Sequence, residues 1–215
     1  MATLGGGGVV TLADWAKQQD PNGRPARIAE LLNQTNDVLR DMLWKEGNLP
    51  TGHQTTIRTG LPSATWRLLN QGTASSKPTE AQITEQCGLL ESWSEVDCAI
   101  ARLNGNVAAY RANKAKSHLE AMNQEMVGTL FYGNSGTAPE EFNGLATRYS
   151  SLGQNCITGG GSQSDNSSIW LIGWGENTIH GIYPKGSSAG LSHHDYGEQT
   201  IETTSGIAGQ RLRVF

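Results

Sequence analysis

The sequence predicts an α+β protein in which one long helix accompanies several short strands. A helical pattern runs for about 27 residues from Asn106 without a helix-breaking residue. Strand candidates separated by turns follow after residue 167. The 27 glycines interrupt most other stretches of the chain, which leaves short elements there. Helices and strands in separate runs are the pattern of an α+β fold.

Composition limits the classes of protein that this chain can belong to. The 215 residues are enough for one or two small domains. The chain has 16 Lys and Arg against 20 Asp and Glu, and charged residues make up 17% of it. A surface with few charges repels other copies weakly, which favours self-association. The sequence contains no basic patch, so nucleic-acid binding is disfavoured as the main function.

Several common classes have no sequence pattern in their favour. No apolar run approaches the roughly 20 residues of a membrane-spanning helix. The opening MATLGGGGVVTL lacks the basic end and apolar stretch of a secretory signal, so we expect a cytosolic origin. Cys87, Cys98 and Cys156 are odd in number and form no CxxC pair. They predict neither a disulfide framework nor a cysteine zinc site.

The first 46 residues predict an arm followed by a helix. Residues 1–24 hold a glycine run and a short helical turn that ends at a Pro/Gly break, which is typical of an arm. Residues 25–46 predict an amphipathic helix, with Pro25 near its first turn and Gly47 just past its end. Its apolar positions follow helical spacing from Ile28 to Leu43. Such a helix packs on its own core more often than on a partner, and both alternatives stay open.

Residues 47–96 predict a long β-hairpin excursion. Short alternating stretches such as TTIRTG, ATWRLLN and AQITEQ are separated by glycine and proline, with the polar segment NQGTASSKPTE between them. A two-stranded ribbon with few apolar residues is marginal by itself. We therefore expect it to lie against a neighbour.

Residues 97–133 predict a long helix. Asn106 is its expected N-cap and Gly133 its expected end, with Val107, Tyr110, Leu119, Met122, Met126 and Leu130 as its buried stripe. A helix of that length, about 40 Å, exceeds the globular average and can act as a spine.

Residues 134–215 predict loops and short strands. The strand candidates are 168–175, 177–184 and 198–204, and GQRLRVF is a possible further strand at the end of the chain.

The sequence gives no catalytic, cofactor or metal site. Gly186–Gly190 matches G-x-S-x-G with Ser188 at its centre, but the pattern needs an Asp and then a His after it, and no histidine follows Asp195 to serve as the base. His193 and His194 stand beside Asp195 and Glu198, yet adjacent histidines on a strand point to opposite sides. A polar loop explains this group better than a metal site. We expect no enzyme activity, no cofactor and no metal.

Long strings of the sequence resemble the major capsid proteins of tailed bacteriophages with the Hong Kong 97-type fold. The strings are LLNQTNDVLRDMLWKEGNLPTGHQTTIRTGLPSATWRLLNQG, SEVDCAIARLNGN, EAMNQEMVGTLFYGN and SDNSSIWLIGWGENTIHGIYPKGSSAGL. The similarity runs from about Thr11 to the end and is more specific than any short motif. Members of that family continue beyond the equivalent of Phe215, so we expect the chain to be a C-terminally shortened form.

The resemblance implies a domain plan and a set of partners. Residues 1–24 would be the N-terminal arm, 47–96 the extended loop over a neighbouring subunit, 97–133 the peripheral domain with its spine, and 134–215 an incomplete axial domain. The subunits would form the hexamers and pentamers of an icosahedral head in the host cytoplasm and remain in the virion. Portal, scaffold or decoration proteins and non-specifically held double-stranded DNA would be partners, and no membrane would be involved.

The resemblance supplies no catalytic residue. Some relatives cross-link their subunits through a lysine, and Lys77 lies in the extended loop, but nothing in the sequence indicates that it reacts. For subunit contacts we select Trp66, Arg67 and Leu68 in the loop and Trp15 in the arm, since aromatic and arginine side chains dominate interfaces. The alternative for Trp66 is that it covers its own ribbon.

Two other functions remain open on the sequence. One is an encapsulin-like nanocompartment shell of the same fold that encloses a protein cargo. The other, more remote, is a serine hydrolase that uses Ser188.

Overall fold

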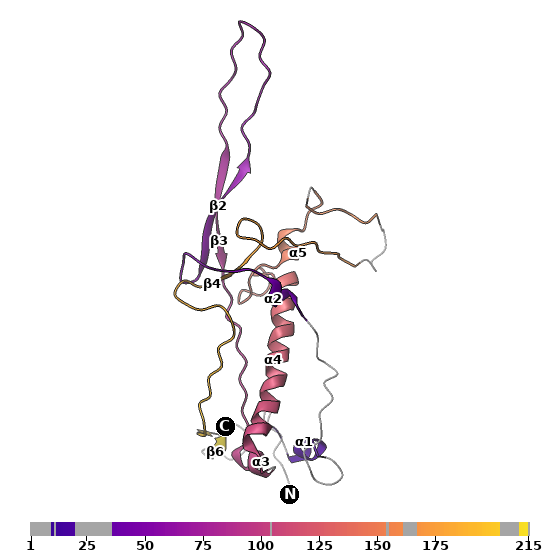
Figure 1. The fold of residues 1–215 in the computed structure, drawn as a ribbon, viewed down its shortest axis with the longest axis vertical. Coiled ribbons are helices and arrows are strands. Elements are labelled where there is room, and N and C mark those ends of the chain that lie inside the picture. The colour runs from indigo at the N-terminus through magenta and orange to yellow at the C-terminus, as the bar shows by residue number, and fades with distance from the viewer. Residues whose placement is uncertain are drawn as a thin grey trace. The chain divides into compact units, whose positions relative to one another are not determined.

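The computed structural model describes residues 10, 12–19, 36–103, 105–153, 155–160, 167–202 and 211–214 (Figure 1). Within these residues the chain forms five helices and six strands. In chain order they are α1 (Leu12–Lys17), α2 (Val38–Asp41), β1 (Trp44–Glu46), β2 (Gly52–Gly60), β3 (Thr79–Gln86), α3 (Cys98–Leu103), α4 (Val107–Tyr132), α5 (Leu145–Arg148), β4 (Gly181–Tyr183), β5 (Gln199–Glu202) and β6 (Arg211–Val214). The described chain contains both helices and strands, which is consistent with the predicted α+β class.

The chain divides into two compact units, and each collects segments that are distant in sequence. The first consists of Met1–Asn36, Leu90–Val127 and Leu191–Phe215. The second consists of Asp37–Leu89 and Gly128–Gly190. The five consecutive segments expected from the sequence do not coincide with these units. Helix α4 passes from the first unit into the second.

The core of the first unit lies where three helices meet. Val96, Ala101 and Tyr110 are buried there, and Trp15 of α1 packs against them together with Ile100 and Val107. These side chains come from α1, from α3 and the residues just before it, and from the first turn of α4. Burial of apolar surface holds this cluster together at roughly 25 cal/mol per Å² removed from water.

Strands β5 and β6 complete the first unit. They pair antiparallel, with Gln199 opposite Val214, and the backbone of Val214 also bridges to Asp97. Asp97 in turn caps α3, since its carboxylate accepts a hydrogen bond from the backbone N–H of Ala99 at 2.8 Å. The last described strand is thereby joined to the start of a helix more than 100 residues earlier in the chain.

Helix α4 begins and ends where the sequence predicts. The Asn106 side chain accepts a hydrogen bond from the N–H of Ala109 at 3.1 Å, which makes it the N-cap. Gly133 follows the last helical residue, and its N–H still donates to the carbonyl of Thr129. Of the predicted buried stripe, Tyr110 is buried and Leu119 is exposed, whereas the other four members are only half-buried: Val107, Met122, Met126 and Leu130.

The predicted helix over residues 25–46 is wrong at its C-terminal end. Residues 26–35 lie outside the described part of the chain, α2 ends at Asp41, and β1 begins at Trp44. In a continuous helix the N–H of Gly47 would donate to the carbonyl of Leu43. Instead, that N–H donates to Tyr183, and that carbonyl accepts from Gly181, because β1 pairs parallel with β4. The tertiary partner overrides the helical spacing.

Of the three strand candidates near the C-terminus, two contain a strand in the structure and one does not. Residues 168–175 form no strand; they contribute one isolated bridge, between Trp174 and Ile179. Here Trp170 packs its ring on Phe131 of α4, with centroids 6.1 Å apart, and the described backbone provides no ladder for the segment. The candidates at 177–184 and 198–204 contain β4 and β5, and the possible terminal strand is β6.

Candidate functional site: an exposed hairpin and its polar root

The main surface feature of the second unit is the antiparallel hairpin of β2 and β3 (Figure 1). Its ladder runs from Gly52 opposite Gln86 to Gly60 opposite Thr79, with an irregularity between Arg58 and Gly60. Beyond the ladder the chain continues as two segments that a hydrogen bond from the Ser76 hydroxyl to the Ser63 carbonyl links at 2.9 Å. Every residue from 61 to 80 is exposed.

The tip of the hairpin is a β-turn at Leu68–Gln71. The N–H of Gln71 donates to the carbonyl of Leu68 at 3.2 Å, and Asn70 adopts a φ of 67°. Asparagine tolerates this left-handed conformation better than most residues. Around the turn, Trp66 and Leu69 have relative exposures of 105% and 89%. Neighbouring large apolar side chains with this exposure are typical of a surface that takes part in an interaction.

Three of the four selected contact residues, Trp66, Arg67 and Leu68, are consecutive and lie at the tip of the hairpin. Leu68 is the first residue of the tip turn, and the Arg67 guanidinium donates to the carbonyl of Gln71 at 3.4 Å. Trp66 does not cover its own ribbon, since its side chain is fully exposed. Trp15 belongs to the other unit and packs against that unit's own core. The Trp15 contact is therefore accounted for within the chain, and a role at an interface stays a prediction.

The hairpin is anchored at its root by Asn48 and by close backbone packing. The Asn48 amide donates to the carbonyl of Gln54 at 2.8 Å and accepts from its N–H at 2.7 Å, as a neighbouring strand would do. A Cβ atom built on Gly52 would lie 1.9 Å from the carbonyl oxygen of Glu85. Only glycine allows the two strands to approach so closely.

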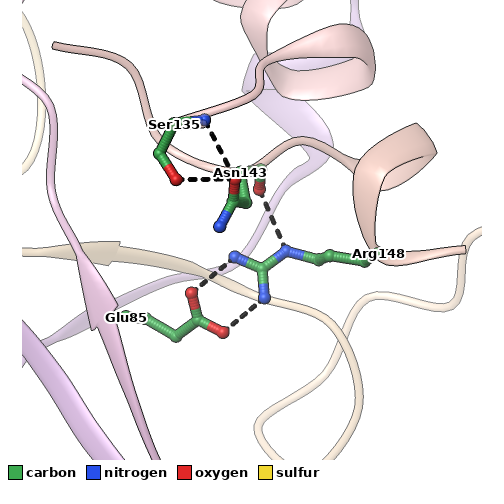
Figure 2. Close-up of polar contacts among 4 residues, drawn as sticks. All are labelled: Glu85, Ser135, Asn143 and Arg148. Carbon is green, nitrogen blue, oxygen red and sulfur yellow. Dashed lines mark hydrogen bonds and ion pairs between the residues drawn. The ribbon is translucent and has the colours of Figure 1, made fainter. Parts of the chain in front are cut away.

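A bidentate ion pair holds the other strand of the root (Figure 2). Both carboxylate oxygens of Glu85, near the end of β3, bind the two terminal nitrogens of Arg148. The Nε of Arg148 also donates to the carbonyl of Asn143 at 2.9 Å. Such fork-to-fork pairs combine charge with fixed geometry. The hydrogen bond from Arg148 holds the pKa of the Glu85 carboxyl below its usual range, although burial opposes this shift.

The segment that carries Asn143 and Arg148 is fixed to the end of α4. The side-chain amide oxygen of Asn143 accepts hydrogen bonds from both the N–H and the hydroxyl of Ser135, at 3.0 and 2.9 Å (Figure 2). The Gly133 carbonyl accepts from the N–H of Gly144 and from the hydroxyl of Thr147. These hydrogen bonds connect the end of α4 with the segment that carries Arg148.

A pocket of about 190 Å³ lies beside this root. Its lining includes Thr84, Glu85, Ser135 and Phe142, and most of it is polar. It is smaller than the 300–1,000 Å³ that is usual for small-molecule sites. The pocket gives no argument for a cofactor.

The two carboxylates that the sequence singled out for possible chemistry form ion pairs within the chain. Asp195 pairs with Arg111, and Glu198 pairs with both Arg102 and Arg213. Among the described residues no group of three or more His, Cys, Asp or Glu is arranged to hold a metal ion. Ser188 is exposed in the turn after Pro184, and the described chain provides no hydrogen bond between it and a histidine.

The cysteines and the helices add no further site. Burial raises the pKa of the Cys87 and Cys98 thiols, which keeps both protonated near neutral pH. The described part of the chain includes no helix that is both long and apolar enough to cross a membrane.

Sequence reasoning missed several residues of this site. Leu61 and Leu69 share the exposure of Trp66, and apolar residues within a polar stretch bounded by Gly and Pro would have indicated them. No sequence pattern indicates the pairing of Glu85 with Arg148, because the two residues are 63 positions apart and neither belongs to a motif.

Comparisons with known proteins agree on one class. The sequence model of the family described as "Major capsid protein GP7" matches residues 20–213. A chain in the cryo-EM structure of bacteriophage Epsilon15 is similar, with 35% sequence identity and a TM-score of 0.62. The match covers 96% of the present chain and 64% of that one, so the present chain spans just under two thirds of its neighbour's length. No curated protein sequence matches.

Proposed function

The chain belongs to the family of major capsid protein GP7, and from this premise we propose that it self-assembles into the icosahedral head shell of a tailed double-stranded DNA bacteriophage or prophage. The observation that carries the proposal is the exposed hairpin. A chain with Trp66 and three leucines exposed in one excursion gains free energy when a second copy covers them. The family is a structural one, so the shell itself is the activity that we propose.

The finer parts of the proposal follow from the resemblance and from the similar phage chain. The fold would be of the Hong Kong 97 type, with residues 1–24 as arm, 25–46 as a connecting segment that is helical only in part, 47–96 as extended loop, 97–133 as peripheral domain and 134–215 as part of the axial domain. The hairpin would lie over a neighbouring subunit in hexamers and pentamers. Assembly would take place in the host cytoplasm, and the protein would remain in the virion.

Partners beyond the chain itself are proposed on weaker grounds. Portal, scaffold or decoration proteins are expected of a phage head. Packaged DNA would contact the inner wall non-specifically, since a net charge of −4 provides no strong attraction for it. The family assignment favours DNA over a protein cargo, so we do not retain the nanocompartment as a second candidate. A hydrolase has no support from the exposed turn of Ser188.

The test is assembly of the full-length protein. We expect purified protein to form closed shells as its concentration rises, visible in cryo-EM and as a fast-sedimenting species in the ultracentrifuge. Reconstruction of the shells would report whether residues 61–80 contact a second subunit. Protein that stays monomeric at high concentration and yields no shells on expression would contradict the proposal. Particles that contain a host protein and exclude DNA during phage growth would contradict the assignment to a phage head.

A further inference from the structure

The direction in which the hairpin leaves its unit depends on its root. Residues 61–80 are all exposed, so their packing against the described chain is slight. The side-chain hydrogen bonds and ion pairs that tie the hairpin to other described segments lie at the root. On β2 they involve His53 and Gln54, which bind Asn48, and on β3 they involve Glu85, which binds Arg148.

The length of the hairpin amplifies any change at that root. Extended backbone rises about 3.3 Å per residue, so the arm from Gly52 through the end of β2 to the tip turn is at most about 55 Å long. A rotation of about 10° at the root would therefore move the tip by up to about 10 Å. Trp66 and its neighbours could then miss the surface that they cover on a second subunit. Accurate placement of the tip requires a rigid root.

The two anchors of the root differ in strength. Asn48 binds β2 through neutral hydrogen bonds close to it in sequence. Arg148 binds β3 through two charge-assisted bonds and is itself held by the carbonyl of Asn143. The Glu85 and Arg148 side chains are only 26% and 38% exposed, so water and salt screen this pair less than a surface pair. Through Gly144 and Thr147 the same segment is bonded to Gly133 at the end of α4.

We propose that the Glu85–Arg148 pair is the positioning element that fixes the hairpin to the end of α4 and so delivers its tip to the neighbouring subunit. The inference rests on the proposed function, because it assumes that the hairpin contacts a second copy of the chain. Neither residue need touch that copy. The fork of Arg148 is required as well as its charge, since lysine can form one point contact but cannot span both carboxylate oxygens and the Asn143 carbonyl.

The experiment measures placement and assembly separately. Spin labels on unnatural amino acids at the exposed positions 73 and 140 report the distance between the tip and the base of the second unit without replacing Asn70 of the tip turn. Glu85→Gln and Arg148→Lys are compared with the wild-type protein. We expect the distance distribution to broaden at least about twofold and the yield of closed shells to fall about tenfold. The charge-swapped double variant, Glu85→Arg with Arg148→Glu, should recover part of both losses.

The matched control is the other ion pair of the same hairpin. Arg58 and Glu80 lie 3.5 Å apart in the ladder, away from the root, with more than half of each side chain exposed. Arg58→Gln removes an arginine–glutamate pair of the same chemistry without touching the anchor. We expect it to leave both the distance distribution and the shell yield unchanged.

The outcomes separate the two proposals. Wild-type protein that forms no shells contradicts the proposed function, whatever the variants do. Wild-type shells together with an Arg148→Lys variant that keeps a narrow distance distribution, or that broadens it and still assembles normally, overturn the positioning role alone. A variant of the pair can also lose its shell yield and unfold at a lower temperature while the distance distribution stays as in the wild type. That result overturns the positioning role as well, because the pair would then act on stability only.

Discussion

At the scale of single residues, the root of the hairpin depends on Gly52. Its α-carbon faces the carbonyl oxygen of Glu85 so closely that no side chain fits without moving one of the strands. Gly72 provides a control on the same excursion, since no heavy atom lies within 4 Å of a Cβ atom built there. The two positions separate steric close packing from the general effect of replacing a glycine.

We predict that Gly52→Ala lowers the free energy of unfolding by about 3 kcal/mol, because a Cβ atom at this position overlaps the opposite strand. Gly72→Ala should change it by no more than about 0.5 kcal/mol. Urea denaturation followed by circular dichroism measures both. Equal effects of the two substitutions would show that the close approach at Gly52 contributes nothing.

The ionisation of Glu85 links the same root to pH. Because Arg148 lowers the pKa of the folded carboxyl below its unfolded value of about 4.3, the folded state binds this proton more weakly than the unfolded state. The stabilisation is therefore complete above about pH 4.3 and is lost as pH falls through the folded pKa.

We predict that Glu85→Gln destabilises the protein by about 1 kcal/mol at pH 7, and that this difference shrinks as pH falls through the folded pKa of the wild-type carboxyl, which Arg148 holds below its usual range. Denaturation curves of both proteins from pH 7 downward through the acid range test this. Glu80→Gln serves as the control, with an effect within about 0.5 kcal/mol at pH 7. A difference between wild type and Glu85→Gln that does not shrink as pH falls would count against a role for the ionised carboxylate.

At the scale of elements, α4 and the hairpin obtain their stability in different ways. Helix α4 has 26 residues, only Tyr110 among them is buried, and Asn106 caps its N-terminal end. A helix so little buried depends more than usual on local terms such as its caps. The hairpin has a regular ladder but little buried surface, so its strands depend on cross-strand pairing and on the root.

We predict that Asn106→Ala lowers the free energy of unfolding by about 1 kcal/mol, because the N–H of Ala109 loses its side-chain acceptor. Asn106→Asp, which keeps the acceptor, should be close to the wild type. Thermal unfolding by circular dichroism at 222 nm compares the three proteins. An alanine variant as stable as the aspartate variant would mean that the cap is dispensable.

At the scale of the whole molecule, some large apolar side chains are buried in the chain's own core and others are exposed to solvent. Trp15 is partly buried in the core cluster of its own unit, whereas Trp66 is fully exposed on the hairpin. A chain that keeps a tryptophan and several leucines in water is incomplete until another molecule covers them. In the proposed shell, self-association would provide that cover.

We predict that Trp66→Ala leaves the stability of the isolated subunit within about 0.5 kcal/mol of wild type and weakens assembly by about 2 kcal/mol per contact. Trp15→Ala should instead lower subunit stability by about 2 to 3 kcal/mol, since it removes buried surface. Calorimetry of subunits and the critical concentration for shell formation give the two quantities. Thr73→Ala on the same excursion is the control for assembly. If Trp66→Ala destabilised the isolated subunit and left assembly unchanged, the indole ring would contribute to the fold of its own subunit and not to a contact.

The sequence by itself determined the features that depend on local chemistry. The spacing of α4, its cap at Asn106 and its end at Gly133 can be recognised within a few residues. The position of the hairpin, and the low charge that favours association, are also local or compositional properties. Long strings of sequence indicated the family, because shared strings of that length do not arise by chance.

Only the tertiary structure decided which distant groups meet. Residues 42–46 leave the helical pattern because β4, some 140 residues later, takes up their backbone hydrogen bonds. Residues 168–175 have the composition of a strand, but a strand forms only where a partner ladder is present. Glu85 finds Arg148 across 63 residues, and no local pattern encodes that choice. Local spacing sets the elements, whereas long-range pairing sets where they end and what holds them.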